Sequence, residues 1–327
     1  MRFTTMIKLG DVTSAQRIIA GRVHRTPLIS SMALGKRTDV HLHFKAEVFQ
    51  KTGSFKPRGA INKLHHLTEE ERKRGVITMS SGNHAQGLAY AASLFGSSAT
   101  VVIPHTTPPN KVNAAKGYGA EVVFTEGDLL TTCLEIQKKR NLTMVHPFDD
   151  LHIVAGQGTI GLEILDDLPE VDVVFVPVGG GGLISGIALA IKLKKPAVKI
   201  VGVEPVGASA MWQSLQQKAV VHLDRIDTIA DGLAAPFVGE LNLALVQKYV
   251  DELVLVSDDE IIEALCLILE RCKILTEPAG AAGFAALLFK KANIPSGSET
   301  VCLLSGGNID RSRLGTFLGL NLYAEII

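Results

Sequence analysis

The chain has 327 residues, of which 46% are apolar and 20% charged, and its 33 Lys and Arg residues balance 33 Asp and Glu residues. This length predicts two domains, or one large α/β body with an inserted piece. A formal net charge of zero, with no basic stripe along the chain, argues against binding to nucleic acid or to an anionic membrane.

The cysteines and the N-terminal segment favour a reducing, cytoplasmic compartment. The N-terminal segment lacks the apolar core of a signal peptide, and no later run has the apolar length of a membrane span. The cysteines contain no C-x-x-C pair, which is typical of reduced thiols and not of a disulfide framework or a zinc site. They are Cys133, Cys266, Cys272 and Cys302.

The segment QKTGSFKPRGA, residues 50–60, predicts a helix start that carries an unusual lysine. Ser54 is a candidate N-cap, and Pro57 suits the first helical position because the amide hydrogen that it lacks would have no partner there. Lys56 is awkward, since a helix N-terminus carries partial positive charge. Either Lys56 points into water, or its amine is held near neutrality, as a nucleophile for a carbonyl group requires.

Strand-like apolar runs alternate with helical patterns in the next part of the chain. GVITMS precedes the helical segment NHAQGLAYAASLFG, and the runs ATVVIP and AEVVFTEG are each followed by a helical segment. Such units predict a parallel sheet covered by helices on both faces. The polar loop after the first strand serves either as a helix cap or as a ligand site. Its side chains are those of Ser80, Ser81, Asn83 and His84.

A second strand-helix series begins near Val171, and the helical segment AGQGTIGLEILDDL links the two series. We therefore expect residues 75–147 to form a small α/β domain inserted into a larger domain, residues 1–74 and 148–327. A cleft between them is the expected place for a ligand. Thr68 and Ser257, each followed three residues later by Glu, predict capping boxes at helix starts.

The segment VDVVFVPVGGGGLISGIALAIKL carries the strongest signal for an anion site. A buried strand is expected to end at Val178, and a helix to begin near Leu183. Glycines between them allow backbone amides to converge on an anion at the helix N-terminus. We interpret this run as a phosphate site. Its members are Gly179, Gly180, Gly181 and Gly182.

A nicotinamide dinucleotide is the alternative ligand for this glycine run. Glu204, near the end of the next strand, matches the acidic residue that such sites require. Ser185, however, stands where the third glycine of G-x-G-x-x-G belongs. An NAD-dependent dehydrogenase is therefore the alternative function that this glycine run leaves open.

A last apolar strand, ETVCLL, is followed by SGGN at residues 305–308. GSFKPRG, SSGNHAQG, PVGGGG and SGGN, in this order, resemble the fold-type II pyridoxal 5'-phosphate (PLP) enzymes, above all the threonine/serine dehydratases (ammonia-lyases) and serine racemases. AGQGTIGLEI, TIADGL and LTEPAGA are further shared segments, so the resemblance covers nearly the whole chain. It implies an α/β fold like that of tryptophan synthase β, with two twisted, mainly parallel sheets and helices on both faces.

The resemblance also implies roles for particular residues. Lys56 would bind the cofactor aldehyde covalently, with Phe55 packed near the ring. Asn83 would donate a hydrogen bond to the phenolic oxygen of the ring, and Ser305 would face the pyridine nitrogen. The four glycines would hold the phosphate. The substrate carboxylate would be held at the helix N-terminus by the loop that contains Ser80, Ser81, Asn83 and His84.

The activity implied is dehydration and deamination of L-threonine or L-serine to 2-oxobutanoate or pyruvate and ammonia. A neutral hydroxyl at Ser305 leaves the ring nitrogen largely unprotonated, which favours elimination or racemisation over transamination. Ser81 keeps serine racemase open, since a serine at this position exchanges the second proton in racemases of this branch. Another β-hydroxy amino acid, such as 3-hydroxyaspartate or a hydroxyectoine-derived compound, is a further alternative.

A cation site and an oligomer are the remaining expectations. Relatives bind a divalent cation where this chain has Glu204, Ala208 and Ala210, but Ala210 replaces the second acid. Because Mg²⁺ and Ca²⁺ need several oxygen ligands, a monovalent ion or water is the alternative occupant. Relatives are often dimers, so we expect a homodimer or tetramer acting on a small amino acid. We expect no C-terminal regulatory domain for isoleucine.

Overall fold

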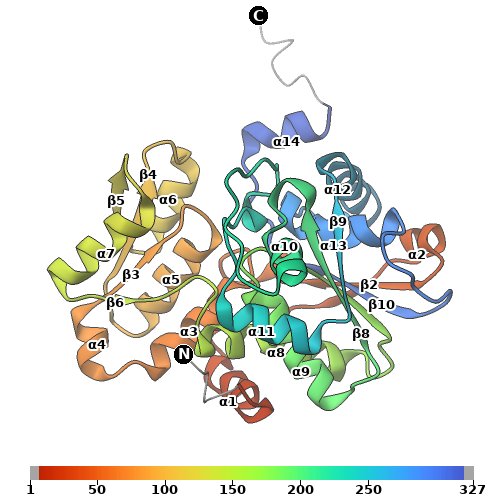
Figure 1. Cartoon of the computed structure of the whole chain (residues 1–327), viewed down its shortest axis with the longest axis horizontal. Helices are drawn as coiled ribbons and strands as arrows, with labels where there is room; N and C mark the ends of the chain where they lie inside the picture. The colour runs from red at the N-terminus through yellow and green to blue at the C-terminus, as the bar shows by residue number, and fades with distance from the viewer. Residues whose placement is uncertain (1–6, 320–327) are drawn as a thin grey trace, which may run out of the picture.

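The computed structural model of the protein describes residues 7–319. Two sheets organise it, and Figure 1 shows them side by side. The larger sheet contains β1 (Leu28–Ser30), β2 (His41–Ala46), β7 (Val173–Pro177), β8 (Lys199–Pro205), β9 (Glu252–Val256) and β10 (Glu299–Leu304). Its strand order is β1-β2-β10-β7-β8-β9, and only the β1–β2 pair is antiparallel.

The smaller sheet has the order β5-β4-β3-β6 and is parallel throughout. It is built from β3 (Val76–Met79), β4 (Ala99–Pro104), β5 (Glu121–Thr125) and β6 (Thr143–Met144). All of these strands fall within residues 75–147, the range expected for a small inserted domain. The helices within this range are α5 (Asn83–Leu94), α6 (Pro109–Gly117) and α7 (Leu129–Arg140), and α4 (Glu69–Arg74) directly precedes it.

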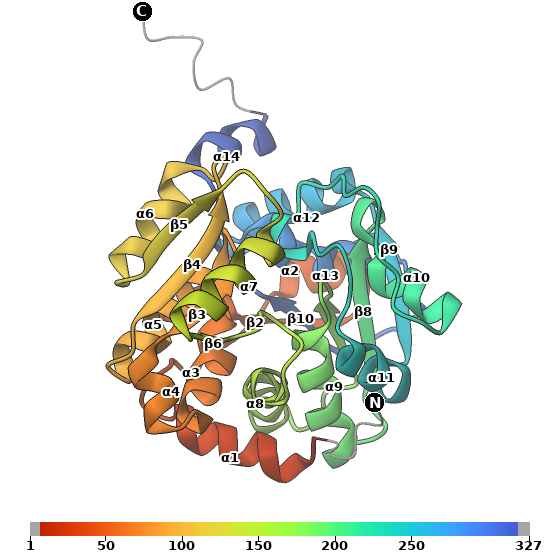
Figure 2. The same cartoon turned by 60° about the vertical axis from the view of Figure 1, so that its left-hand side comes forward.

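The other helices surround the larger sheet, and Figure 2 shows α8 and α9 lying next to each other below it. The α-helices are α1 (Leu9–Ile19), α2 (Met32–Thr38), α3 (Lys56–His66), α8 (Leu151–Asp167), α9 (Gly182–Lys194), α10 (Ala210–Gln217), α11 (Glu240–Tyr249), α12 (Asp258–Cys272), α13 (Pro278–Leu288) and α14 (Arg311–Phe317). The 3-10 helices are η1 (Glu47–Phe49), η2 (Val206–Ala208) and η3 (Asp231–Leu233).

The central strands of the larger sheet are buried on both faces, as parallel strands between helical layers must be. Along β7, Val173 and Phe175 pack into one core with residues of α12 and α13, including Phe284. Val174 and Val176 point the other way, into a core formed with α8 and α9. Successive side chains of a strand point to opposite faces of the sheet, so a strand that is buried on both faces needs a continuous apolar run.

Helix starts follow the local sequence in two places and depart from it in one. Thr68 and Ser257 each accept a hydrogen bond from the Glu amide three residues later, so both predicted capping boxes are confirmed. The predicted cap at Ser54 is wrong: α3 begins at Lys56, with Phe55 as N-cap and Pro57 in the second position. Within residues 7–319, no helix combines the length and apolar composition needed to cross a membrane.

Candidate active site

A cavity of about 910 Å³ lies between the carboxyl ends of strands from both sheets. Met79 and Pro104 end β3 and β4, and Pro177 ends β7, so the cavity occupies the place where ligands bind in open α/β sheets. Every residue expected to bind cofactor or substrate lines it. These residues are Phe55, Lys56, Ser80, Ser81, Asn83, His84, Gly179, Gly180, Gly181, Gly182 and Ser305.

Lys56 enters the cavity from the first position of α3. Its Nζ donates a hydrogen bond to the Pro147 carbonyl at 3.1 Å and lies 4.9 Å from the centre of the Phe55 ring. Burial lowers the pKa of Lys56 to about 8, while the charge of Glu277 acts to raise it. An amine with this pKa is partly neutral near physiological pH. Of the two alternatives given for Lys56, a side chain in water or an amine held near neutrality, its burial therefore favours the second.

The segment before Lys56 is fixed by the loop after β10 instead of by a side-chain cap. The Phe55 amide donates to the Ser305 carbonyl at 3.1 Å, and Ser54 forms an isolated antiparallel bridge with Gly306. The Ser54 hydroxyl finds no hydrogen-bond partner in the described part of the chain. These backbone contacts hold the lysine helix next to Ser305, which is 3% exposed.

The glycine run forms a wall of the cavity without side chains. Gly181 has φ of +94°, which favours glycine, and a Cβ there would lie 2.7 Å from Met211 Cε and 2.8 Å from Asn242 Cβ. Asn242 fixes the loop by donating to the Gly180 carbonyl at 2.9 Å. Helix α9 begins at Gly182, and the first amides of a helix have no acceptor within it. This donor set fits the PLP phosphate.

Asn83, at the start of α5, is held by partners from distant segments. Its Nδ2 donates to Glu277 Oε1 at 2.7 Å, and its Oδ1 accepts from Asn308 Nδ2 at 2.8 Å. Asn308 also donates to the Thr52 carbonyl at 2.7 Å. Burial raises the pKa of Glu277 to about 7, although the Asn83 hydrogen bond lowers it. The sequence alone indicates no role for Glu277, which belongs to the segment LTEPAGA.

The rest of the loop between β3 and α5 faces the same cavity. The Ser80 hydroxyl accepts from the Gly82 amide at 3.3 Å. The His84 ring lies 3.2 Å from the Val145 carbonyl, measured from Nε2, and burial lowers its pKa to about 3. His84 is therefore neutral at physiological pH, so it would contribute a hydrogen bond to a substrate and not a full positive charge.

The expected cation ligands lie outside the cavity lining. Glu204 is buried, and its two carboxylate oxygens accept hydrogen bonds from the amides of Met211 and Trp212, each at 2.8 Å. Burial raises the pKa of Glu204 to about 8. Glu204 thus satisfies the first amides of α10, at whose start Ala210 stands. Among the described residues, no cluster of three His, Cys, Asp or Glu side chains could hold a metal ion.

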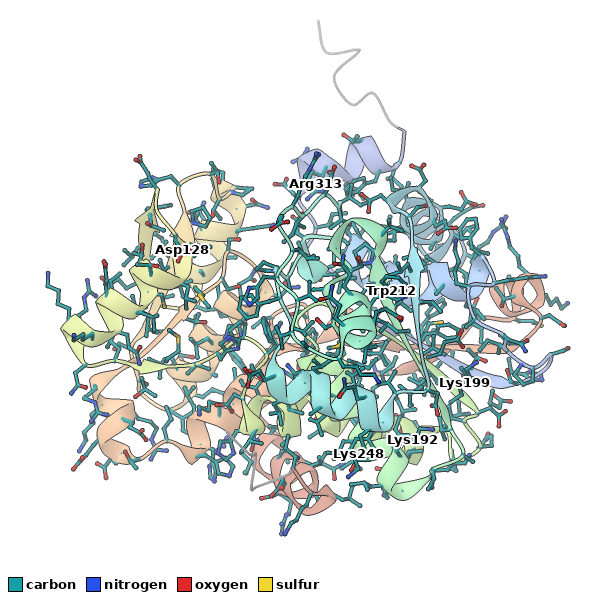
Figure 3. The ribbon with its side chains drawn as sticks, in the orientation of Figure 1. Asp128, Lys192, Lys199, Trp212, Lys248 and Arg313 are labelled. Atoms are coloured by element: carbon teal, nitrogen blue, oxygen red, sulfur yellow. The ribbon has the colours of Figure 1, made fainter. Side chains whose placement is uncertain are left out.

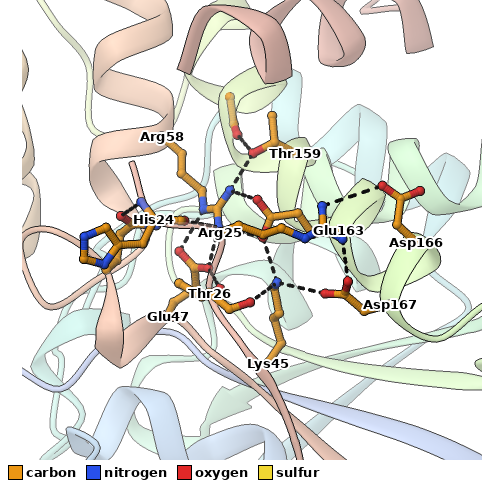
Figure 4. Close-up of polar contacts among 12 residues, drawn as sticks. His24, Arg25, Thr26, Lys45, Glu47, Arg58, Thr159, Glu163, Asp166 and Asp167 are labelled. Carbon is orange, nitrogen blue, oxygen red and sulfur yellow. Dashed lines mark hydrogen bonds and ion pairs between the residues drawn. The ribbon is translucent and has the colours of Figure 1, made fainter. Parts of the chain in front are cut away.

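A buried ion cluster anchors the helix that carries Lys56, and Figure 4 shows its contacts. Arg58, fully buried on α3, donates to both oxygens of Glu47 at 2.8 Å and to both oxygens of Glu163, at 2.7 and 2.9 Å. Lys45 contacts Glu163 at 2.7 Å from the other side. The charges of the two glutamates raise the pKa of Arg58 against the effect of burial, so it stays charged.

Comparison with known proteins agrees with this geometry. The family model described as "Pyridoxal-phosphate dependent enzyme" matches residues 19–306. The L-threonine ammonia-lyase of Thermotoga maritima is 46% identical over 97% of this chain and 79% of its own length. A catabolic L-threonine dehydratase of Staphylococcus aureus is 45% identical over 97% of this chain and 94% of its own length.

A solved structure with a similar fold is that of maize serine racemase. It superposes with a TM-score of 0.91 at 38% identity and covers 95% of this chain and 97% of its own. The family match spans both sheets and the cavity-lining residues from Phe55 to Ser305. It therefore favours PLP over the dinucleotide alternative, and the chain belongs to the family of pyridoxal-phosphate-dependent enzymes.

Proposed function

We propose that this protein dehydrates L-threonine and L-serine to enamines, which are hydrolysed to 2-oxobutanoate or pyruvate, respectively, with release of ammonia. The observation that carries the proposal is the convergence of Lys56 and the glycine run on one cavity. Similarity to the threonine ammonia-lyase and dehydratase relatives supports the substrate class. Bound PLP supplies an electron sink for the electrons that remain when the α proton leaves.

Lys56 has two tasks in this proposal. Its partly neutral amine is the group that holds the cofactor covalently, and once the substrate has taken its place it removes the α proton as general base. Phe55 supports the lysine, since its ring centre lies 4.9 Å from Nζ. A buried amine with a pKa of about 8 is suited to both tasks because its two protonation states are close in free energy.

The remaining polar groups orient the cofactor and substrate. Asn83 Nδ2 carries a second hydrogen beyond the one given to Glu277, and we assign that donor to the ring oxygen. Ser305 is assigned to the ring nitrogen and the glycine amides to the phosphate. The substrate carboxylate is assigned to the start of α5, which favours an anion. The ligands there are Ser80, Ser81, Asn83 and His84.

After the α proton has been removed, the Cβ–O bond breaks and the β-hydroxyl group takes up a proton and leaves as water. The enamine product then leaves the site and reacts with water, which yields the 2-oxo acid and ammonia. The proposal includes a homo-oligomer in the cytoplasm and a small domain at residues 75–147 within a larger one at residues 1–74 and 148–327. The proposal assigns no metal to the reaction, because the carboxylate of Glu204 already accepts hydrogen bonds from two backbone amides. Glu204 and Ala208 keep a structural role.

Release of 2-oxo acid from L-threonine and L-serine tests the proposal. Lys56→Ala should lose turnover and the visible absorption of bound cofactor, while its matched control Lys73→Ala should keep both. Lys73 is an exposed lysine that pairs with Glu69 on α4. Turnover of L-threonine by Lys56→Ala near the unmodified rate would show the proposal to be wrong.

Serine racemisation is the second candidate, and Ser81 is the observation that favours it. Ser81 lines the cavity that contains Lys56, so a hydroxyl is available as a second proton-exchanging group. The similarity to maize serine racemase adds support. Chiral analysis of L-serine after incubation tests this candidate. D-serine formed by the unmodified protein and lost in Ser81→Ala supports it, and absence of D-serine rejects it.

A further inference from the structure

Three charged side chains from separate segments meet at one edge of the cavity. Asp231 in η3 accepts hydrogen bonds on Oδ2 from Lys111 Nζ of α6 at 3.0 Å and from Arg313 Nη1 of α14 at 2.7 Å. Arg313 also donates to the Ile229 carbonyl at 3.1 Å. Figure 3 shows Arg313 on α14 above the larger sheet, while Lys111 belongs to the region of the smaller sheet.

The lining of the cavity contains more Asp and Glu than Lys and Arg side chains. Of the described residues that line it, Lys56, Lys111 and Arg313 are the lysines and arginines. Lys56 is assigned to the cofactor in the proposed function, and Asp231 accepts hydrogen bonds from the other two. The acidic residues of the lining are Asp128, Asp231, Glu277 and Asp310.

Asp231 remains ionised beside these cations. Burial acts to raise its pKa, but the hydrogen bonds and charges of Lys111 and Arg313 prevail and lower it. The group also acts on the interior of the site, because the charges of Lys111 and Asp231 shift the pKa of Glu277 in opposite directions. Glu277 holds Asn83, so the ion pair lies within electrostatic range of the proposed substrate position.

We propose that Asp231 restricts the site to amino acids with uncharged side chains by occupying the two cations that a side-chain carboxylate would need. The inference rests on the proposed function, in which the α-carboxylate of the substrate is bound by the α5 loop. A second carboxylate, as in 3-hydroxyaspartate or aspartate, would enter a lining with an excess of acid and find its cations already paired. An unpaired anion in a partly desolvated site binds poorly.

The test compares two ligands that lack a β-hydroxyl and differ in side-chain charge. L-aspartate and L-alanine are titrated into the PLP-loaded protein, and binding is followed by the absorbance change of the cofactor. In Asp231→Asn, Lys111 and Arg313 lose their anionic partner. The ratio of the dissociation constants of aspartate and alanine should fall by about fivefold or more, the size expected for a partly exposed charge pair.

Two further variants separate this effect from general damage. Asp227→Asn removes an exposed aspartate of the same connecting segment that pairs with Arg225, and its ratio should match that of the unmodified protein. Adding Lys111→Met to Asp231→Asn should abolish most of the gain. An unchanged ratio in Asp231→Asn, including equal weakening of both ligands, would overturn the inference. Because the ratio needs no turnover, failure of L-threonine dehydration would reject the proposed function separately.

Discussion

Asn83 and Glu277 lie 194 positions apart in the chain, and the Asn83 amide donates a hydrogen bond of 2.7 Å to a carboxylate oxygen of Glu277. The contact joins the first turn of α5 to the N-cap residue of α13. Asn308 completes it by donating to Asn83 Oδ1. Both the nitrogen and the oxygen of the Asn83 side-chain amide thus have partners within the protein, so the orientation of this amide in the cavity is determined before any ligand binds.

The attachment of PLP to the cofactor-free protein should depend on pH through Lys56. Only the neutral amine attacks the aldehyde, and burial lowers the pKa of Lys56 from 10.5 to about 8. Because of the lowered pKa, Lys56 in the folded protein loses its proton at a lower pH than an ordinary lysine does. The attachment rate should therefore rise with pH around a midpoint near 8. Stopped-flow absorbance measures it, and a rise confined to the range of ordinary lysines would contradict the prediction.

Glu277→Gln should move this midpoint to lower pH. The charge of Glu277 acts to raise the pKa of Lys56, so its removal makes the ammonium form less stable. The glutamine oxygen can still accept from Asn83, which keeps the local structure in place. The same pH series on this variant checks the shift. Asp128→Asn, a change at another acidic residue of the cavity lining, serves as the control and should leave the midpoint near its original position.

Gly181→Ala should weaken cofactor binding strongly. The substitution combines an unfavourable φ of +94° with contacts of 2.7 and 2.8 Å to Met211 and Asn242. Gly21→Ala is the matched control, since Gly21 has φ of +72° and no atom within 4 Å of the added Cβ. Strain alone should cost the control about 1 kcal/mol of unfolding free energy. We expect Gly181→Ala to lose more stability than this and at least tenfold in PLP affinity, about 1.4 kcal/mol.

Arg58→Met should destabilise the fold by about 3–5 kcal/mol, because it removes the guanidinium from two buried glutamates, of which Glu163 keeps only its contact with Lys45. Chemical denaturation of the PLP-loaded protein measures the change. Arg140→Met removes an exposed arginine that pairs with Glu121, and it should cost at most about 1 kcal/mol. Equal losses in the two variants would mean that the buried cluster contributes no more than a surface ion pair.

Much of the fold follows from local sequence. Apolar runs of strand length gave β3, β4, β7 and β10, and the capping boxes at Thr68 and Ser257 start helices where expected. These signals are short-range, since they depend on residues within a few positions of one another. The glycine run and Lys56 were recognisable for the same reason. Each is unusual against its immediate neighbours.

The partners of the site residues could not be predicted in this way. Glu277 meets Asn83 only because the loop after β3 and the start of α13 converge at one cavity, and local patterns carry no information about that distance. Asp231 with Lys111 and Arg313 is a second example. The failed cap at Ser54 has the same origin, because a bridge to Gly306, far along the chain, sets its backbone.

The ion cluster around Arg58 has a consequence for the order in which the protein is assembled. It ties Lys45 and Glu47, near the start of the chain, to Glu163, which the ribosome makes more than a hundred residues later. Lys56 lies two positions before Arg58, so the helix that carries it is anchored through this cluster once these segments have met. The visible absorption of PLP bound to a newly synthesised molecule would thus report that its N-terminal segment and the segment around Glu163 have already come together.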